Sequence, residues 1–170
     1  MSPESNQVFK LETLTTAIAR TPQTWRSIVF TNGCFDLIHA GHVRYLAAAK
    51  ALGKTLIVGL NSDASVCQLK GESRPIVPQA YRAEVLAALK PVDAVVIFNE
   101  LTAIETIKAL QPDIYVKGGD YEIATLPEAP TVQSYGGKIE LIQVELPTST
   151  SAIVNRIKSG RSLAECFDKV

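Results

Sequence analysis

Five short apolar runs are spaced along the chain and predict five β-strands. They lie at residues 27–31, 55–60, 94–98, 114–116 and 138–144. Most of these runs are rich in Ile and Val and lack alternation between polar and apolar positions. That pattern is typical of strands that are buried on both faces of a parallel sheet.

Between the predicted strands, apolar residues recur at intervals of three and four, which predicts helices. The first helix contains Val43 and Leu46 on one face, and Gly53 would end it. Two further helices are expected at residues 81–89 and 101–110, and each stops before a proline. Because strands and helices alternate, we expect an α/β fold, namely a doubly wound, Rossmann-like parallel sheet in a single domain.

The two ends of the chain are less regular. We expect residues 1–24 to form an N-terminal helical extension, residues 25–158 to form the main domain and residues 159–170 to form a C-terminal tail. Residues 121–130 contain two prolines and little periodicity, which predicts a loop or a short helix.

Composition narrows the class of protein. Hydrophobic residues make up 46% of the chain and charged residues 20%, and the formal net charge is zero. We therefore expect no nucleic-acid or membrane partner, and any anion site must be local. Three cysteines without a CxxC pair, no signal-peptide pattern and no apolar run of about 20 residues predict a soluble cytoplasmic protein.

Candidate chemistry gathers in TNGCFDLIHAGH, residues 31–42, which holds both histidines of the chain. Ligands of open α/β sheets bind beyond the carboxyl ends of the strands, where this stretch lies. Gly33 would let the backbone approach a ligand, and a helix beginning near residues 40–41 would offer free N–H groups. His39 and His42, three apart at that helix start, can both address one anion, and a phosphate fits best.

Simpler interpretations of the histidines remain open. They could be surface or capping residues, or they could bind zinc with Cys34 or Asp36 as a further ligand. Zinc needs at least three protein ligands and no third histidine exists, so we expect no protein-bound metal. Neither GxGxxG nor GxxxxGK[ST] occurs, which disfavours a dehydrogenase and a P-loop NTPase.

The stretch TNGCFDLIHAGHVRYL resembles the (T/N)GxFDxxHxGH signature of the nucleotidyltransferase superfamily, which includes cytidylyltransferases and adenylyltransferases. Three further stretches resemble the same superfamily in the same order: KGESRP (70–75), KGGDY (117–121) and TSTS (148–151), the last before a predicted helix at residues 152–158. Together with NSDASV (61–66) and YRAEVLAAL (81–89), these stretches are most similar to the adenylyltransferases of ADP-heptose synthesis.

The resemblance implies roles for individual residues. His39, His42 and Lys70 would be catalytic, stabilising charge on the α-phosphoryl group and the leaving pyrophosphate. Asp36 and Arg82 would face the acceptor substrate. The implied nucleotide-binding residues are Asn32, Gly33, Cys34, Phe35, His39, His42, Arg74, Lys117, Gly119, Asp120, Thr148, Ser149, Thr150 and Ser151.

The resemblance also implies a reaction: direct in-line transfer of the adenylyl group of ATP to a sugar 1-phosphate, a heptose 1-phosphate being the closest match. Mg²⁺ would arrive with ATP, and the implied partners are a second copy in a homodimer and a separate sugar kinase and phosphatase. One alternative is a cytidylyltransferase for a polyol phosphate such as glycerol 3-phosphate, which the lack of an arginine in residues 144–151 disfavours. Another is a non-catalytic nucleotide-binding module, and a fragment related to class I tRNA synthetases ranks last.

Overall fold

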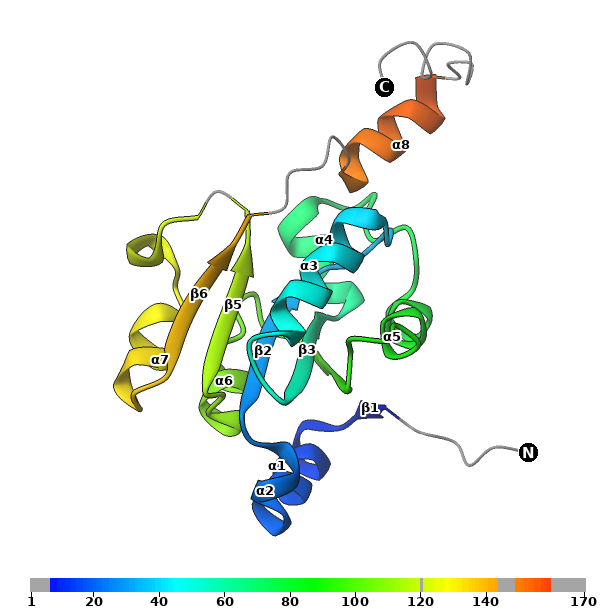
Figure 1. The fold of residues 1–170 in the computed structure, drawn as a ribbon. Helices are drawn as coiled ribbons and strands as arrows, with labels where there is room; N and C mark the ends of the chain where they lie inside the picture. Colours follow the sequence, from blue (N-terminus) through cyan, green and yellow to red (C-terminus); the bar gives the residue numbers. More distant parts are fainter. Residues whose placement is uncertain (1–6, 120, 144–148, 160–170) are drawn as a thin grey trace, which may run out of the picture.

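A computed structural model of the protein describes residues 7–119, 121–143 and 149–159. Within them, six parallel strands form one sheet with helices on both faces (Figure 1). The strands are β1 (Val8–Phe9), β2 (Ile28–Gly33), β3 (Thr55–Asn61), β4 (Ala94–Phe98), β5 (Ile114–Gly118) and β6 (Lys138–Ile142). The helices are α1 (Leu11–Arg20), α2 (Pro22–Trp25), α3 (Ala40–Lys50), α4 (Asp63–Lys70), α5 (Gln79–Ala87), α6 (Ile104–Leu110), the 3₁₀ helix η1 (Ile123–Thr125), α7 (Ala129–Ser134) and α8 (Thr150–Ser159).

The strand order fixes where a ligand can bind. The order is β1-β4-β3-β2-β5-β6, so the chain runs outward from β2 to β4 and then returns to place β5 on the other side of β2. Thr31 of β2 pairs with Val58 of β3 on one side and with Val116 of β5 on the other. The order of the strands therefore reverses between β2 and β5. In such folds ligands bind beyond the carboxyl ends of the strands at this topological switch point.

Two hydrophobic clusters hold the helices on the sheet. One joins Leu14 of α1, Ile107 of α6 and Val132 of α7 to one face of the strands. The other joins α3 and α5 to the opposite face through residues such as Leu46 and Leu86. Each strand thus has apolar side chains on both faces, and this explains why the strands read as unbroken apolar runs.

The α/β class and the parallel sheet are confirmed, and so are the five predicted strands. β4 has the predicted limits, while β2 and β5 each run two residues further than predicted, to Gly33 and Gly118. β6 ends at Ile142, earlier than predicted. The predicted helix after β2 is α3, which ends at Lys50, so Gly53 does not end it as expected. The loop or short helix expected at residues 121–130 contains η1 and the start of α7.

The N-terminal segment contains an unexpected strand. Val8 and Phe9 form β1, which pairs with β4 at one edge of the sheet. A two-residue strand is too short to give a periodic pattern, and Phe9 therefore reads as part of the helix that follows it. Leu14 and Ile18 of α1 belong to the same cluster as the sheet.

The predicted boundaries after residues 24 and 158 stay predictions. No helix in the described ranges combines the length and apolar character that crossing a bilayer requires.

Candidate active site

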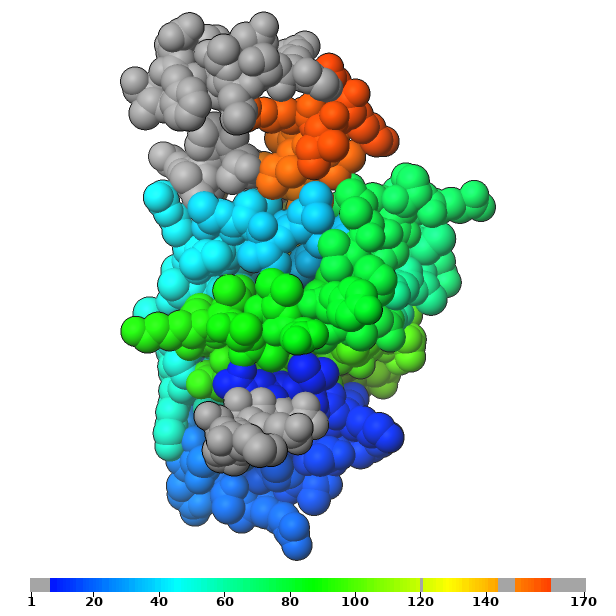
Figure 2. All heavy atoms as spheres, turned by 90° about the vertical axis from the view of Figure 1, so that its right-hand side faces the viewer, coloured from blue at the N-terminus to red at the C-terminus, as the bar shows by residue number. Residues whose placement is uncertain are grey.

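The candidate residues meet at the edge of the sheet where β2 and β5 end. The turn after β2 leads into α3, whose first residue is Ala40. The start of α8 reaches the same turn, because the Thr150 hydroxyl donates a hydrogen bond of 3.4 Å to the carbonyl of Leu37. Figure 2 shows α8, in orange, against the light-blue residues that follow β2. Two helix N-termini therefore lie close to one turn, an arrangement that suits an anionic ligand.

His39 has a defined role in the local structure. It is the N-cap residue of α3, and its Nδ1 accepts a hydrogen bond of 3.1 Å from the N–H of Gly41. A neutral imidazole whose Nδ1 accepts carries its proton on Nε2. The capping interpretation of His39 is therefore correct, and it leaves Nε2–H as a donor for a ligand.

His42 stacks beside His39, with ring centroids 4.0 Å apart, and lies 5.3 Å from the ring of Phe35. Its Nδ1 is buried and has no hydrogen-bond partner within the described residues. Burial, followed by the neighbouring His39, lowers the pKa of His42 to about 4, and burial also lowers the pKa of His39. Both imidazoles are therefore neutral near pH 7, and a bound polyanion would raise both pKa values.

Cationic side chains approach the same turn from the loop after α4. Lys70 ends α4, is exposed, and forms no hydrogen bond or ion pair with the residues that the structure describes. Burial raises the pKa of the Cys34 thiol, while the charges of Lys70, Arg82 and Arg74 act against that rise. Three cationic side chains therefore act at Cys34, and the Asp36 carboxylate acts there in the opposite direction.

Asp36 and Arg74 bind each other. The Arg74 Nε donates to Asp36 Oδ2 at 2.6 Å, and the Asp36 side chain is only 1% exposed. Asp36 Oδ1 accepts from the N–H groups of Ile76 and Val77 at 2.8 and 3.0 Å. Asp36, expected from the resemblance to face the acceptor, thus has three protein donors around its carboxylate.

Arg82, the other residue expected to face the acceptor, is also buried, with 1% of its side chain exposed. Its guanidinium donates to the carbonyl oxygens of Val77, Cys34 and Asn61 and to the Asp63 carboxylate, at 2.5 to 2.9 Å. Arg82 therefore ties the ends of β2 and β3 to the starts of α4 and α5.

On the β5 side, Asn32 is the centre of a polar group. Its Oδ1 accepts from Lys117 Nζ at 2.9 Å and from the Tyr115 hydroxyl at 2.8 Å. Burial lowers the pKa of Lys117, and Glu128 and Cys34 oppose that change. The double contact orients the Asn32 amide, so that its nitrogen is the group left for a ligand.

Glycine lets α3 approach the end of β5. A Cβ atom on Gly118 would lie 2.7 Å from the ring of Tyr45. The Tyr45 hydroxyl is within 2.7 Å of the Thr31 hydroxyl and donates to the carbonyl of Val116 at 3.1 Å. Gly119, which follows with φ of +112°, is exposed.

Most of the predicted site residues share this edge of the sheet. The roles of all these residues stay predictions, and Asp120 and Thr148 lie outside the described residues. Ser149 accepts from the N–H of Ala152 at 3.1 Å and thus caps α8, whose predicted existence is confirmed. Sequence analysis missed the supporting residues Tyr45, Tyr115 and Glu128. Glu128 is 3% exposed, with one carboxylate oxygen unpartnered in the described structure.

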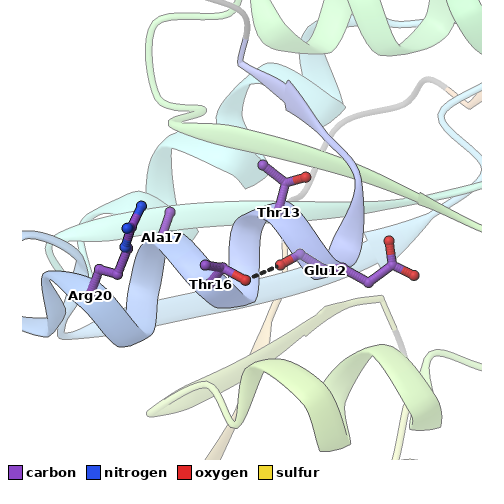
Figure 3. Close-up of a pocket in the computed structure, with 5 residues that line it drawn as sticks. All are labelled: Glu12, Thr13, Thr16, Ala17 and Arg20. Carbon is purple, nitrogen blue, oxygen red and sulfur yellow. Dashed lines mark hydrogen bonds between the residues drawn. The ribbon is translucent and has the colours of Figure 1, made fainter.

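A concavity lies away from this site, along α1. It measures about 410 Å³ and is lined by Glu12, Thr13, Thr16, Ala17 and Arg20 (Figure 3). Thr16 donates to the carbonyl of Glu12 at 2.7 Å, an ordinary contact within a helix. α1 lies at the end of the sheet where β2 begins (Figure 1), so this concavity contains none of the predicted residues.

The amino-acid sequence is similar to a known family and to characterised proteins. A family model described as cytidylyltransferase-like matches residues 30–161. The bifunctional protein HldE of Citrifermentans bemidjiense is 49% identical over 155 residues, which cover 91% of this chain and 32% of that protein. The chain thus spans about a third of the length of the curated relatives it matches.

Solved structures support the fold. The lipopolysaccharide core biosynthesis protein from Thermoplasma volcanium is 25% identical, with a TM-score of 0.58 over 71% of this chain and 98% of that one. The pantoate-beta-alanine ligase from Francisella tularensis is 15% identical, with a TM-score of 0.60 over 95% and 84% of the two chains. The second likeness is one of fold alone.

Proposed function

This chain belongs to the cytidylyltransferase-like family, and from that membership we propose that it transfers the adenylyl group of ATP to a heptose 1-phosphate. The products would be an ADP-sugar and pyrophosphate. The observation that carries the proposal is the pair of neutral histidines at the start of α3, in a turn where the charge of Lys70 acts at Cys34. The similarity of five sequence stretches to adenylyltransferases of ADP-heptose synthesis supports the choice of substrates.

The proposed reaction needs no general base. A sugar phosphate oxygen is already a nucleophile near pH 7, because its second pKa is about 6. It attacks the α-phosphorus in line, a new P–O bond forms, and the bond to the β-phosphate oxygen breaks with its electrons leaving on pyrophosphate. What the protein must supply is stabilisation of the negative charge that builds on the transferring group and the leaving group.

Several residues of the site would share this stabilisation of negative charge. His39 donates Nε2–H to a phosphate oxygen, and His42 donates from the same side of the turn. Lys70 and Arg74 bind the triphosphate from the loop after α4, and the starts of α3 and α8 add backbone N–H groups. Asn32, Lys117 and the backbone of Gly119 would face the rest of the nucleotide, with Asp120, Thr148 and Ser151 assigned from the motif similarity alone.

Mg²⁺ would accompany ATP and neutralise part of its charge. The described residues include no group of three His, Cys, Asp or Glu that could hold a metal ion. Asp36, the carboxylate nearest the histidine turn in sequence, is already bound by Arg74 and two backbone N–H groups. The residues present therefore fit a metal that is carried by the triphosphate and water, as Mg²⁺ commonly is.

The expected homodimer, the separate sugar kinase and phosphatase, and the cytoplasmic location stay part of this proposal. Light scattering of the purified protein tests the dimer.

The experiment that tests the function is a substrate panel. The protein is incubated with Mg²⁺, one of ATP, CTP, GTP or UTP, and one of several sugar 1-phosphates or glycerol 3-phosphate, and released pyrophosphate is measured. We expect release with ATP and a heptose 1-phosphate. Release only with CTP and glycerol 3-phosphate would move the assignment to a polyol-phosphate cytidylyltransferase, and nucleotide binding without release would indicate a non-catalytic module.

A further inference from the structure

The Asp36 carboxylate is enclosed by the loop that connects α4 to α5. Its side chain is 1% exposed, and it accepts from the Arg74 side chain and from the N–H groups of Ile76 and Val77. A sugar hydroxyl could reach it only if this loop moved away. The geometry therefore indicates that Asp36 serves to hold this loop in place.

Val77 is held from both sides. Its N–H donates to Asp36 Oδ1 at 3.0 Å, while its carbonyl accepts from Arg82 Nε at 2.8 Å. Arg82 belongs to α5 and also donates to the carbonyl of Cys34, two residues before Asp36. The loop carrying Arg74 is thus fixed to the same turn that carries the histidines.

Arg74 itself uses only part of its guanidinium. Nε binds Asp36, and the side chain is 18% exposed. Nη1 and Nη2 make no hydrogen bond within the part of the chain that the structure describes, where the Arg74 side chain donates through Nε alone. The Arg74 charge nevertheless acts at Cys34, in the turn between β2 and the histidines. A guanidinium held at Nε presents its two Nη groups as a fork, and this geometry suits bidentate binding of a phosphate.

We propose that Asp36 is a positioning residue, which holds Arg74 at Nε and directs the two Nη groups toward the triphosphate of ATP, and that it does not contact the acceptor. The inference rests on the proposed function for the identity of the anion. A flexible arginine on an exposed loop would lose more conformational entropy on binding, and fixing it beforehand reduces that loss.

A double-mutant cycle tests this inference. Asp36→Asn keeps one oxygen for the two backbone N–H groups but replaces the acceptor of Arg74 Nε with an NH₂ group. The cycle compares wild type, Asp36→Asn, Arg74→Met and the double variant by calorimetric titration with Mg²⁺–ATP, followed by the KM for each substrate. Arg44→Met, which removes an exposed arginine of α3, is the matched control and should bind ATP as wild type does.

We expect Asp36→Asn to weaken ATP binding by about 5-fold or more, because residues in direct contact couple strongly. The KM for the sugar phosphate should change by less than about 2-fold, and Asp36→Asn should add nothing further in the Arg74→Met background. A raised KM for the sugar phosphate with unchanged ATP affinity would overturn the inference, as would equal effects of Asp36→Asn in both backgrounds.

Two further results keep the test decisive. If Asp36→Asn does not fold, Arg74→Lys replaces it, since lysine keeps the charge but lacks the planar fork that binds a phosphate through two Nη groups while Nε holds Asp36. We expect Arg74→Lys to bind ATP as weakly as Arg74→Met, and wild-type affinity would overturn the inference. If the four variants show the expected coupling in ATP binding but the wild-type protein releases no pyrophosphate, the proposed function is contradicted and this inference stands.

Discussion

At the scale of single residues, His42 links the site to the pH dependence of stability. Its pKa of about 4 in the folded protein lies below the ordinary value of 6.5. The unfolded chain therefore takes up this proton first as the pH falls, so the contribution of neutral His42 is complete above pH 6.5 and is lost progressively down to about pH 4. Urea unfolding at several pH values should show that His42→Asn reduces the decline of stability in this window. Parallel curves for both proteins would contradict the lowered pKa.

Lys70 provides a second prediction at this scale. Its ammonium is unpaired among the described residues and would act on charge that develops in the transition state. Lys70→Ala should therefore lower kcat far more than it raises the KM for ATP. Steady-state kinetics check this. Lys90→Ala is the control, because Lys90 is also exposed but precedes β4, at the end of the sheet where the strands begin. A change in KM alone would mean that Lys70 binds the ground state and the transition state equally.

At the scale of elements, α3 packs on the sheet and, in the proposed function, carries the catalytic histidines at its start. His39→Ala removes its N-cap and should cost about 0.5–2 kcal/mol of stability, whereas His39→Asn keeps a good capping residue and should cost less. Both variants lack the Nε2–H donor, so each should lower kcat by about 10²-fold or more. Thermal unfolding and pyrophosphate release measured on both variants separate the two roles. Near-wild-type turnover of His39→Asn would remove His39 from the catalytic assignment.

The same scale shows what could be predicted from sequence. Buried strands such as β3 and β4 were recognisable because apolar side chains cover both of their faces. β1 was not recognisable, because a strand of two residues gives no periodic pattern of apolar positions. The location of the histidine turn followed from the strand–helix junction. The burial of Arg82 could not be predicted, since an arginine in an amphipathic helix ordinarily faces water and three of its four acceptors, on Cys34, Asn61 and Asp63, come from other segments of the chain.

At the scale of the whole molecule, the proposed anion site of this neutral chain would join separate segments. The turn after β2, the loop after α4, the end of β5 and the start of α8 meet at one edge of the sheet, held by Arg82, Asp36 and Thr150. The nucleobase would lie at the end of β5 beside Gly119, where an added Cβ atom would meet nothing closer than the Tyr121 ring at 3.6 Å, whereas Tyr45 fills the space beside Gly118. A purine extends further than a pyrimidine, so this space favours adenine over cytosine.

The measurement that tests this account most directly is kcat/KM for ATP and for CTP with the same heptose 1-phosphate and Mg²⁺. A wrong base leaves a buried polar group without its partner, which costs about 1–3 kcal/mol, or roughly 10–100-fold in kcat/KM. We predict that ATP is preferred by at least that factor and that the product is an ADP-sugar. Equal or better use of CTP would contradict the account.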